Sequence, residues 1–320
     1  MKFGTMDYTI FFISAVLIQF SRLAESWSPV GFPLRRMNGS TSTMTRMSSS
    51  DSADSSTSKK GKLLVLGGTG FLGQAVCKRA IMEGYEVTSL SRRGLPPLKS
   101  DADSISTLDK VDYRQGDARS PESLINILSV GGFSGVIHCV GLLFDSESGL
   151  GDLNKYASGS GSLLDSKSTY DAITRQTAFN AIDASIDYAI DNGMKKPLPF
   201  CFTSAAEVGW PDVPGGQFMQ KIAPDFLKQY LAAKRVVESK LMDSKPTLRP
   251  IIVRPSLIYS MDRPASYLPV AGFFFFNRVG APFVDRPVTV QSLAAAMVRS
   301  MGSEDVSGVL RYKEIERLSS

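Results

Sequence analysis

The sequence predicts an α/β protein built on a doubly wound parallel sheet, followed by a small C-terminal region. Three observations favour this class. Short apolar runs alternate with helix-compatible segments, a glycine-rich turn follows the first of these runs, and the charged fraction is ordinary for a globular chain. Alternating strands and helices with apolar strand cores are typical of a parallel sheet that is covered on both faces.

Composition limits the class of protein further. Of the 320 residues, 43% are hydrophobic and 21% are charged, which is close to the usage of globular domains and unlike that of disordered or multi-spanning membrane chains. The three cysteines, Cys77, Cys139 and Cys201, are widely spaced, and His138 is the one histidine. These counts exclude a disulfide framework and predict no metal site built on His or Cys.

The positive charge lies mostly at the start of the chain. Residues 1–62 hold eight Lys and Arg against four Asp and Glu, so four of the five net positive charges belong to them. The rest of the chain is almost neutral and carries no basic stripe that would neutralise the phosphates of a nucleic acid. We therefore expect no nucleic-acid partner.

Residues 1–26 are predicted to be a signal peptide. The mostly apolar segment 9–20 suits a signal-peptide core better than the ~20 residues of a membrane-spanning helix, and Ala24-Glu25-Ser26 offers small residues for cleavage. Residues 27–61 are rich in Ser and Thr and carry scattered cations, which is typical of a disordered transit segment. We expect no transmembrane span in the mature chain.

This two-part leader resembles the bipartite targeting sequences of algae with plastids of secondary origin, and it predicts import into a plastid (chloroplast). The junction in those leaders is usually Ala-x-Ala before Phe, whereas this chain has Ser26 and Trp27. Two alternatives stay open. One is a mitochondrial presequence, and the other is a secretory signal followed by a disordered linker.

The body, residues 62–320, opens with a turn that predicts a phosphate-binding site. An apolar strand, 62–66, and a helix-compatible segment, 74–83, enclose the sequence Gly67-Gly68-Thr69-Gly70-Phe71-Leu72-Gly73. Such glycines allow a tight turn, a close approach of the backbone to a pyrophosphate and close packing of helix on strand. The diphosphate would lie at the helix N-terminus. The sequence therefore predicts a Rossmann domain that binds a dinucleotide.

The second strand, 85–90, is followed by Arg92 and Arg93. An NAD site would carry an Asp or Glu about here, ~20 residues after the glycines, to bind the adenosine ribose. A guanidinium group can instead bind the 2′-phosphate of NADP. We expect NADP as the cofactor and keep NAD as the alternative; the two arginines are otherwise solvated loop residues.

Two further strands are predicted to contact the cofactor at their carboxyl ends. The strand 111–115 leads into Asp117, which we expect to flank the adenine. The fourth strand, predicted at 135–141, ends with Val140 and Gly141 beside the cofactor's ribose. His138 lies inside this strand and is interpreted as a buried packing residue.

Several motifs together resemble the extended and atypical short-chain dehydrogenase/reductases. They are the glycine turn, the Gly-Asp after the third strand, the segment TSAAEV at 203–208, and the pair Tyr230 and Lys234. The segments 139–145 and 254–259 are similar to the branch of the complex I 39 kDa subunit and its relatives in ubiquinone biosynthesis. The resemblance implies a Rossmann domain with a small C-terminal substrate region, bound NADPH, and an association with quinone metabolism or a membrane complex.

Tyr230 and Lys234 are predicted to be the catalytic pair. They lie four residues apart in the helix-compatible segment 226–241, so both stand on one helix face. The ammonium group is expected to lower the pKa of the tyrosine, which then exchanges a proton with a substrate oxygen while hydride moves to or from a nicotinamide. By resemblance, Lys234 also binds the nicotinamide ribose. A surface pair without function is the alternative.

One position departs from the superfamily pattern. The Ser or Thr that binds the substrate oxygen in that superfamily falls on Ala205 here, 25 residues before Tyr230. Either Ser204 takes this catalytic role through a twist or bulge of the strand, or polarisation of the substrate oxygen is weakened. Asn180 is a candidate for the fourth member of the constellation.

Two further segments are predicted near the mouth of the site. The Gly- and Ser-rich insertion at 142–169 is long enough to be functional or mobile, and Tyr170 and Arg175 after it are candidates to face a substrate. The phenylalanine run 273–276 is too short to span a bilayer. It is interpreted as core, as a lid for a lipid-like quinone, or as a contact with a membrane partner.

These expectations combine into a leading hypothesis and its rivals. The leading one is an NADPH-binding oxidoreductase acting on a carbonyl or quinone-type substrate, small or lipid-like, with a link to quinone biosynthesis. The rival, which Ala205 favours, is a catalytically silent nucleotide-binding subunit of a membrane-associated complex. A third option is an epimerase or dehydratase acting on a nucleotide sugar; it needs retained NAD, which Arg92 and Arg93 argue against.

Overall fold

The computed structural model describes residues 60–97, 107–142, 169–260 and 284–320. Nearly all of the predicted leader, nearly all of the insertion and the whole phenylalanine run lie outside the described residues. Within the described ranges, no helix combines the length and the apolar character needed to cross a membrane.

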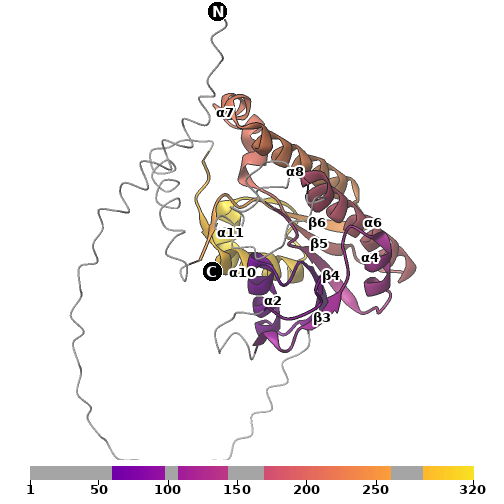
Figure 1. Ribbon diagram of the computed structural model, residues 1–320. Coiled ribbons are helices and arrows are strands. Elements are labelled where there is room, and N and C mark those ends of the chain that lie inside the picture. Colours follow the sequence, from indigo (N-terminus) through magenta and orange to yellow (C-terminus); the bar gives the residue numbers. More distant parts are fainter. Residues whose placement is uncertain (1–59, 98–106, 143–168, 261–283) are drawn as a thin grey trace, which may run out of the picture. The chain divides into compact units, whose positions relative to one another are not determined.

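A seven-stranded sheet lies at the centre of the described body (Figure 1). Its strands are β1 (Lys62–Leu66), β2 (Glu86–Ser91), β3 (Asp112–Gln115), β4 (Phe133–His138), β5 (Leu198–Thr203), β6 (Leu248–Val253) and β9 (Gly308–Leu310). All neighbours run parallel in the order β3-β2-β1-β4-β5-β6-β9. The order reverses between β1 and β4, so the carboxyl ends of these strands border the crevice where such sheets bind ligands.

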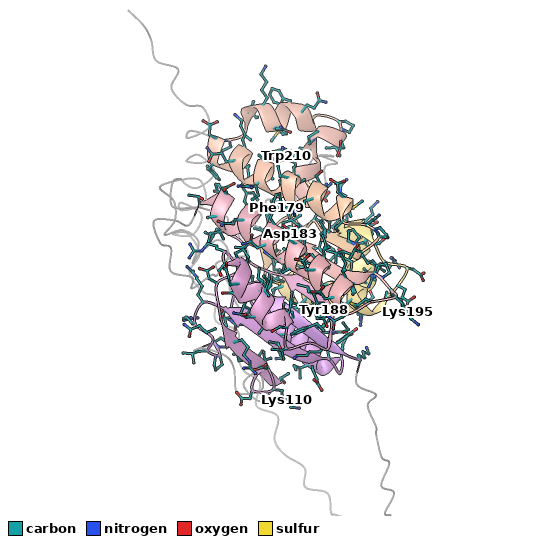
Figure 2. The ribbon with its side chains drawn as sticks, turned by 90° about the vertical axis from the view of Figure 1, so that its right-hand side faces the viewer. Lys110, Phe179, Asp183, Tyr188, Lys195 and Trp210 are labelled. Carbon is teal, nitrogen blue, oxygen red and sulfur yellow. The ribbon has the colours of Figure 1, made fainter. Side chains whose placement is uncertain are left out.

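Helices cover both faces of the sheet, which confirms the predicted doubly wound α/β class. On one face lie α2 (Phe71–Met82), α10 (Val290–Gly302) and α11 (Tyr312–Ser319). On the other lie α4 (Pro121–Leu128), α6 (Thr177–Asp191) and α8 (Asp225–Asp243). Figure 2 looks onto this second face, where Phe179, Asp183 and Tyr188 follow one another along α6.

Burial on both faces explains why the strands are unbroken apolar runs. In β1, Leu63 and Val65 pack into the cluster with α2 and α10, whereas Leu64 and Leu66 pack into the cluster with α4 and α6. Successive side chains of a strand point to opposite faces, so a strand covered twice needs apolar residues at every position.

Two predicted boundaries differ from the structure. β4 begins at Phe133 and ends at His138 instead of covering 135–141, because its partner β1 ends at Leu66, which pairs with His138. Val140 and Gly141 therefore lie beyond the strand, at the crevice. The first helix begins at Phe71 instead of residue 74. Gly73 thus lies in its first turn, where the helix packs so closely on the glycine turn that no Cβ atom fits.

Shorter elements surround the carboxyl ends of β5 and β6. They are the π-helical turn η2 (Asp171–Gln176), the 3-10 helix η3 (Ala206–Asp212), α7 (Gly216–Ile222) and the parallel pair β7 (Ile258–Tyr259) and β8 (Val288–Thr289). η2 continues directly into α6, and η3 follows β5 after two residues. The small C-terminal substrate region that the resemblance implies stays a prediction, and residues 261–283 of the C-terminal part lie outside the described ranges.

Candidate functional site

The turn after β1 forms a cradle that side chains would fill. Gly67 has a φ of +80°, a backbone conformation that favours glycine. A Cβ atom at Gly73 would lie 2.1 Å from the Gly67 carbonyl oxygen, and one at Gly68 would lie 2.3 Å from the Ser89 hydroxyl. Only glycine therefore lets α2 and β2 approach the turn this closely.

The N-terminus of α2 is open to an anion. Its N-cap residue, Gly70, provides no side-chain cap, and the first turn holds no acidic residue. The Gln74 side chain donates to the Thr69 carbonyl oxygen at 2.9 Å and braces the turn from within the helix. Backbone N–H groups and the helix dipole at a helix N-terminus bind phosphate, so a pyrophosphate fits this turn.

The segment after β4 lies against the same turn. A Cβ atom at Gly67 would contact the Val140 side chain at 3.1 Å, and one at Gly141 would lie 3.7 Å from Lys234 Nζ. The structure thus brings the glycine turn, Val140, Gly141 and Lys234 together at the carboxyl ends of β1 and β4. Sheets with this strand order bind dinucleotides in that crevice.

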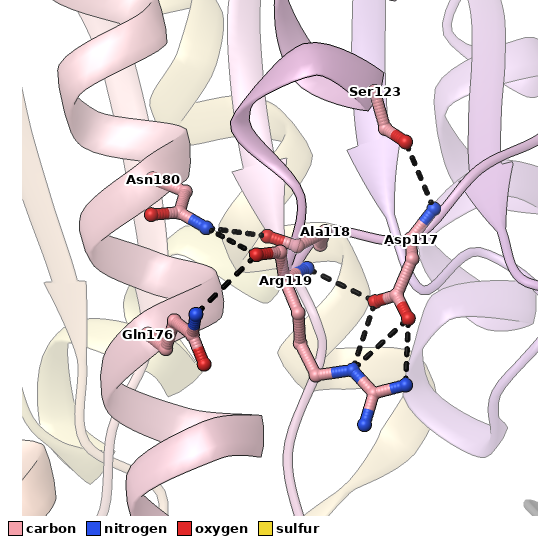
Figure 3. Close-up of polar contacts among 6 residues, drawn as sticks. All are labelled: Asp117, Ala118, Arg119, Ser123, Gln176 and Asn180. Atoms are coloured by element: carbon pink, nitrogen blue, oxygen red, sulfur yellow. Dashed lines mark hydrogen bonds and ion pairs between the residues drawn. The ribbon is translucent and has the colours of Figure 1, made fainter.

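The loop after β3 holds Asp117 in a fixed position (Figure 3). Its carboxylate accepts hydrogen bonds from the Arg119 guanidinium at 2.7 Å and from the Arg119 backbone N–H at 2.9 Å. The Asp117 backbone N–H donates to Ser123 Oγ at 3.3 Å. Burial by itself would raise the pKa of Asp117, but Arg119 and the charge of Arg92 lower it below its usual range. Asp117 is therefore ionised.

Asn180, the candidate for the fourth member of the constellation, anchors this loop. Its side-chain amide donates to the carbonyl oxygens of Ala118, at 3.2 Å, and Arg119, at 2.9 Å (Figure 3). Gln176 reaches the same Arg119 oxygen at 3.4 Å. The α6 helix thereby positions the loop that carries Asp117.

Arg92 and Arg93 follow β2 and are both exposed. The charge of Arg92 contributes to the lowered pKa of Asp117, so Arg92 lies beside the loop after β3. The two arginines therefore stand at the β2 side of the crevice, where the spacing after the glycines predicted them.

Tyr230 and Lys234 lie on one face of α8, as predicted. Lys234 Nζ is 5.3 Å from the centroid of the Tyr230 ring and 5.0 Å from that of Phe202. It donates a hydrogen bond to the Thr203 carbonyl oxygen at 2.6 Å. Lys234 is only 3% exposed, and this burial lowers its pKa to about 8 in spite of the opposing charge of Glu238.

The expected lowering of the Tyr230 pKa is wrong for this structure. Burial raises the pKa of Tyr230 above its usual value, and Glu207 and Tyr170 act in the same direction. The Tyr170 ring packs edge-on against the Tyr230 ring, with the centroids 5.7 Å apart. Because apolar surroundings disfavour a phenolate, Tyr230 is a neutral phenol that can donate a proton.

The two residues that follow the insertion have different environments. Tyr170, which the sequence offered as a candidate to face a substrate, is 4% exposed and packs against Tyr230. Arg175 instead forms an ion pair with Asp171 and lies over the Phe179 ring, 5.4 Å from its centroid. Only Tyr170 is therefore part of the site.

Ser204 does not supply the hydroxyl that is missing at Ala205. Its Oγ donates to Glu238 at 2.5 Å, and Glu238 also accepts from Arg254 at 2.9 Å. Ala205, one residue further along the extended chain, packs into the cluster that contacts Tyr230. Since neighbouring side chains of an extended chain point in opposite directions, the catalytic role predicted for Ser204 does not fit the structure.

His138 is fully buried, which confirms that it is a packing residue. Its Nε2 lies 3.1 Å from Thr177 Oγ1. Burial, and secondly the charge of Lys234, lower the pKa of His138 to about 3, so the imidazole is neutral. Among the described side chains, no group of three or more His, Cys, Asp or Glu is placed to bind a metal ion.

Sequence reasoning assigned no role to Glu207, which lies in the first turn of η3. This half-buried carboxylate accepts a hydrogen bond from Ser256 Oγ at 3.4 Å. Burial raises the pKa of Glu207 to about 7, and the charge of Asp285 acts in the same direction. The available signal was an acidic residue four positions after the end of a buried strand that ends at the site.

The strand order, the glycine cradle and the Tyr230–Lys234 pair define a Rossmann nucleotide-binding protein of the short-chain dehydrogenase/reductase type. The chain belongs to the NAD dependent epimerase/dehydratase family, whose family model matches residues 63–271. The superfamily resemblance carried by the sequence motifs is thereby confirmed, and binding of NAD or NADP is a property of this family.

One relative is similar over most of the body, and another over a short segment. MIOREX complex component 2 of Saccharomyces cerevisiae is 26% identical over 287 residues, which are 79% of this chain and 98% of that protein. An Arabidopsis thaliana protein described as chloroplastic is 46% identical over 59 residues, 18% of either chain.

Two solved structures share the fold. Pal from Bacillus thuringiensis matches with a TM-score of 0.50 at 18% identity, over 81% of this chain and 82% of that one. UDP-glucose 4-epimerase from Bifidobacterium longum, in complex with NAD+ and UDP, matches with a TM-score of 0.50 at 18% identity, over 78% and 77%. At this identity the likeness shows the fold alone.

Proposed function

We propose that this protein binds NADPH and is an oxidoreductase acting on a carbonyl or quinone-type substrate. One observation carries the proposal: the glycine turn, the segment after β4 and the Lys234 ammonium meet at one crevice, with the Tyr230 ring 5.3 Å from Lys234 Nζ. A nicotinamide bound in this crevice would supply hydride transfer.

The residues around the crevice fit separate parts of such a cofactor. Residues 67–73 would bind the diphosphate through backbone N–H groups and the α2 N-terminus. Asp117 would accept a hydrogen bond from the adenine, and Val140 and Gly141 would border a ribose. Lys234 would donate to the nicotinamide ribose.

Arg92 and Arg93 support NADP over NAD. Both lie in the loop after β2, where a carboxylate would repel a 2′-phosphate and a guanidinium binds it. The two residues are exposed and therefore accessible to a phosphate.

The Tyr230 phenol is the proton donor of the proposed reduction. Burial keeps the phenol protonated, and in the reduction it gives its proton to the substrate oxygen. The Lys234 ammonium lies beside the ring and stabilises the phenolate that remains.

The alternative is a catalytically silent nucleotide-binding subunit of a membrane-associated complex. Ala205 provides no hydroxyl, and the Ser204 hydroxyl binds Glu238. One relative carries the name of a complex component, which is consistent with a structural role in an assembly. A link to quinone biosynthesis belongs to the enzyme hypothesis.

We test nucleotide binding first, by titrating the purified chain with NADPH and NADH in a calorimeter. We expect NADPH to bind and to bind more tightly than NADH. Turnover is then measured as NADPH oxidation with panels of quinones and aldehydes, for the wild type and for Tyr230→Phe, which keeps the ring that packs on Tyr170.

Three outcomes separate the hypotheses. Loss of turnover in Tyr230→Phe with unchanged NADPH affinity supports the enzyme. Binding without turnover, or identical traces for the two chains, supports the silent subunit. Absence of binding to either nucleotide contradicts both.

We further propose delivery to an organelle, with the plastid preferred and the mitochondrion as the alternative. The two-part leader supports this, as does the relative described as chloroplastic. The destination is tested with a fluorescent protein fused to residues 1–62, compared with the same fusion carrying Trp27→Ala. Fluorescence confined to the endoplasmic reticulum contradicts import.

A further inference from the structure

An open groove of about 350 Å³ runs along α8 on a different side from the crevice. Four residues of α8 line it at helical spacing, namely Arg235, Glu238, Ser239 and Met242. Neither Tyr230 nor Lys234 lines it, because successive residues of a helix point about 100° apart and Arg235 follows Lys234 directly. The groove is therefore separate from the candidate nucleotide site.

Most of the wall of this groove is apolar. Val208 and Pro211 contribute from η3, Ile252 from β6 and Val309 from β9. Val309 is 40% exposed and Met242 is 38% exposed, since β9 is the last strand of the sheet order and the groove opens at this edge. Its volume lies within the range of small-molecule sites, and its wall can cover the apolar body of a ligand.

The Arg235 guanidinium lines the groove without a counter-charge. It is half-buried, its Nε donates to the Val208 carbonyl oxygen at 3.2 Å, and its Nη2 donates to Gln220 Oε1 at 3.1 Å. Both acceptors are uncharged. Among the described residues, no carboxylate forms an ion pair with Arg235 and no acceptor binds its Nη1. The two hydrogen bonds fix the guanidinium while its charge and Nη1 stay available.

The other charges of the groove do not neutralise Arg235. Arg254 and Glu238 form a pair of their own, with Arg254 Nε donating to Glu238 Oε1 at 2.9 Å and side chains 16% and 8% exposed. Asp212, at the end of η3, is exposed, so water and salt screen its charge. The buried and half-buried side chains of the groove therefore carry one positive charge in excess.

We propose that this groove binds a small carboxylate with an apolar body. The carboxylate accepts hydrogen bonds from the Arg235 guanidinium, which matches the planar shape and the charge of such a group. The apolar body packs against Pro211, Met242 and Val309. An uncharged ligand of the same shape leaves Arg235 without a counter-charge, and a bare inorganic anion leaves the apolar wall in water.

The first test compares three probes on the full wild-type chain by calorimetry at neutral pH. Benzoate has the proposed chemistry, benzamide has the same shape without the charge, and inorganic phosphate has charge without an apolar body. We expect benzoate to bind at least about tenfold more tightly than either of the others, because a charge-assisted hydrogen bond is lost in one case and apolar burial in the other. No saturable binding of benzoate, or equal affinity for any two of the probes that include benzoate, overturns the proposal.

The second test locates the probe. Arg235→Gln removes the charge and keeps a donor, so we expect it to weaken benzoate binding about tenfold and to leave the affinity for benzamide unchanged. Lys228→Gln is the matched control, because Lys228 also lies on α8, binds Asp225 at 3.3 Å and does not line the groove. Urea unfolding shows that both variants are folded. Wild-type affinity for benzoate in Arg235→Gln, or equal losses in the two variants, contradicts the assignment.

A third measurement separates this inference from the proposed function. Benzoate is titrated with and without saturating NADP+, and we expect the same affinity, since Arg235 and Lys234 lie on different sides of α8. Displacement of benzoate by NADP+ would place the probe in the crevice and would overturn the proposal. None of these tests uses NADPH oxidation, so the groove assignment stands or fails independently of the oxidoreductase. If the chain binds no nucleotide, the first two tests still decide it.

Discussion

Burial favours the neutral forms of the three ionisable residues in the candidate site. It raises the pKa of Tyr230, raises that of Glu207 to about 7 and lowers that of Lys234 to about 8. The pKa values of Glu207 and Lys234 approach the working pH, so these two groups exchange protons at little free-energy cost, whereas Tyr230 stays protonated. The same environment disfavours a standing phenolate, so the pair cannot be described as a tyrosine activated by its lysine alone.

At the residue scale, we predict that Arg92→Ala weakens the binding of NADPH by about tenfold or more, because it removes a charge-assisted hydrogen bond to the 2′-phosphate. The affinity for NADH, which has no such phosphate, should stay the same. Calorimetry with both nucleotides checks this. The same measurement on Arg93→Ala shows how much the second guanidinium contributes to the affinity for NADPH. An equal loss of affinity for the two nucleotides would show that Arg92 stabilises the loop and does not bind the 2′-phosphate.

At the element scale, two elements position the site. They are the turn that joins β1 to α2, and the α8 helix. The turn depends on backbone contacts that tolerate no Cβ atom. The helix is held by a buried network in which Glu238 accepts from both Ser204 and Arg254. This network connects α8 to the ends of β5 and β6, and thereby fixes the helix that carries Tyr230.

We predict that Gly73→Ala lowers the free energy of unfolding by about 1–3 kcal/mol and abolishes nucleotide binding. The added Cβ would lie 2.1 Å from the Gly67 carbonyl oxygen and would force α2 away from the turn. Gly141→Ala is the matched control, because its Cβ would meet Lys234 Nζ at an ordinary 3.7 Å. Urea unfolding of the two variants checks the free energy of unfolding, and calorimetry with NADPH checks the loss of binding in Gly73→Ala. Equal unfolding midpoints for the two variants would contradict the prediction.

The network on α8 gives a second prediction at this scale. Glu238→Gln leaves Arg254 buried without a counter-charge, so we expect a loss of about 3 kcal/mol in the free energy of unfolding together with reduced NADPH oxidation. The side chains of Arg254 and Glu238 are 16% and 8% exposed.

A surface pair serves as the control for Glu238. Lys196 and Glu304 lie 2.5 Å apart with side chains 76% and 73% exposed. Exposed pairs contribute little because water screens them, so Glu304→Gln should leave the free energy of unfolding almost unchanged. Comparable losses in the two variants, measured by urea unfolding, would mean that burial of the Glu238 pair has no energetic consequence.

At the scale of the whole molecule, the pH dependence of stability follows from the one histidine of the chain. Burial first, and the Lys234 charge second, lower the pKa of His138 to about 3 from the usual 6.5. Between these values the unfolded chain binds a proton that the folded chain does not. The contribution of His138 to stability is therefore fully present above pH 6.5 and is lost as the pH drops towards 3.

We predict that His138 accounts for a loss of about 2 kcal/mol in the free energy of unfolding between pH 6.5 and pH 5, at about 1.4 kcal/mol per pH unit. Urea unfolding at pH 7 and pH 5 checks this for the wild type and for His138→Gln. The carboxylates contribute equally to both chains, so the difference between the two pH effects isolates His138. The same pH effect in both chains would contradict the assignment.

Local patterns in the chain were sufficient for the doubly wound sheet and the glycine turn. A strand covered on both faces must be apolar at each position, and a turn without room for Cβ atoms must be glycine, so both requirements leave a mark on neighbouring residues. The spacing of Tyr230 and Lys234 likewise follows from the helix repeat. These inferences need no knowledge of distant contacts.

Long-range contacts decided the remainder of the site. Ser204 meets a residue 34 positions away, and Asn180 meets one 62 positions away, so neither partner could be inferred from neighbouring letters. The protonation states of Tyr230 and Glu207 depend on how much water the packed elements exclude. The sequence by itself shows which positions must carry an apolar side chain and which must be glycine. The direction in which each polar side chain points, and its protonation state, are decided only when separate segments of the chain pack together.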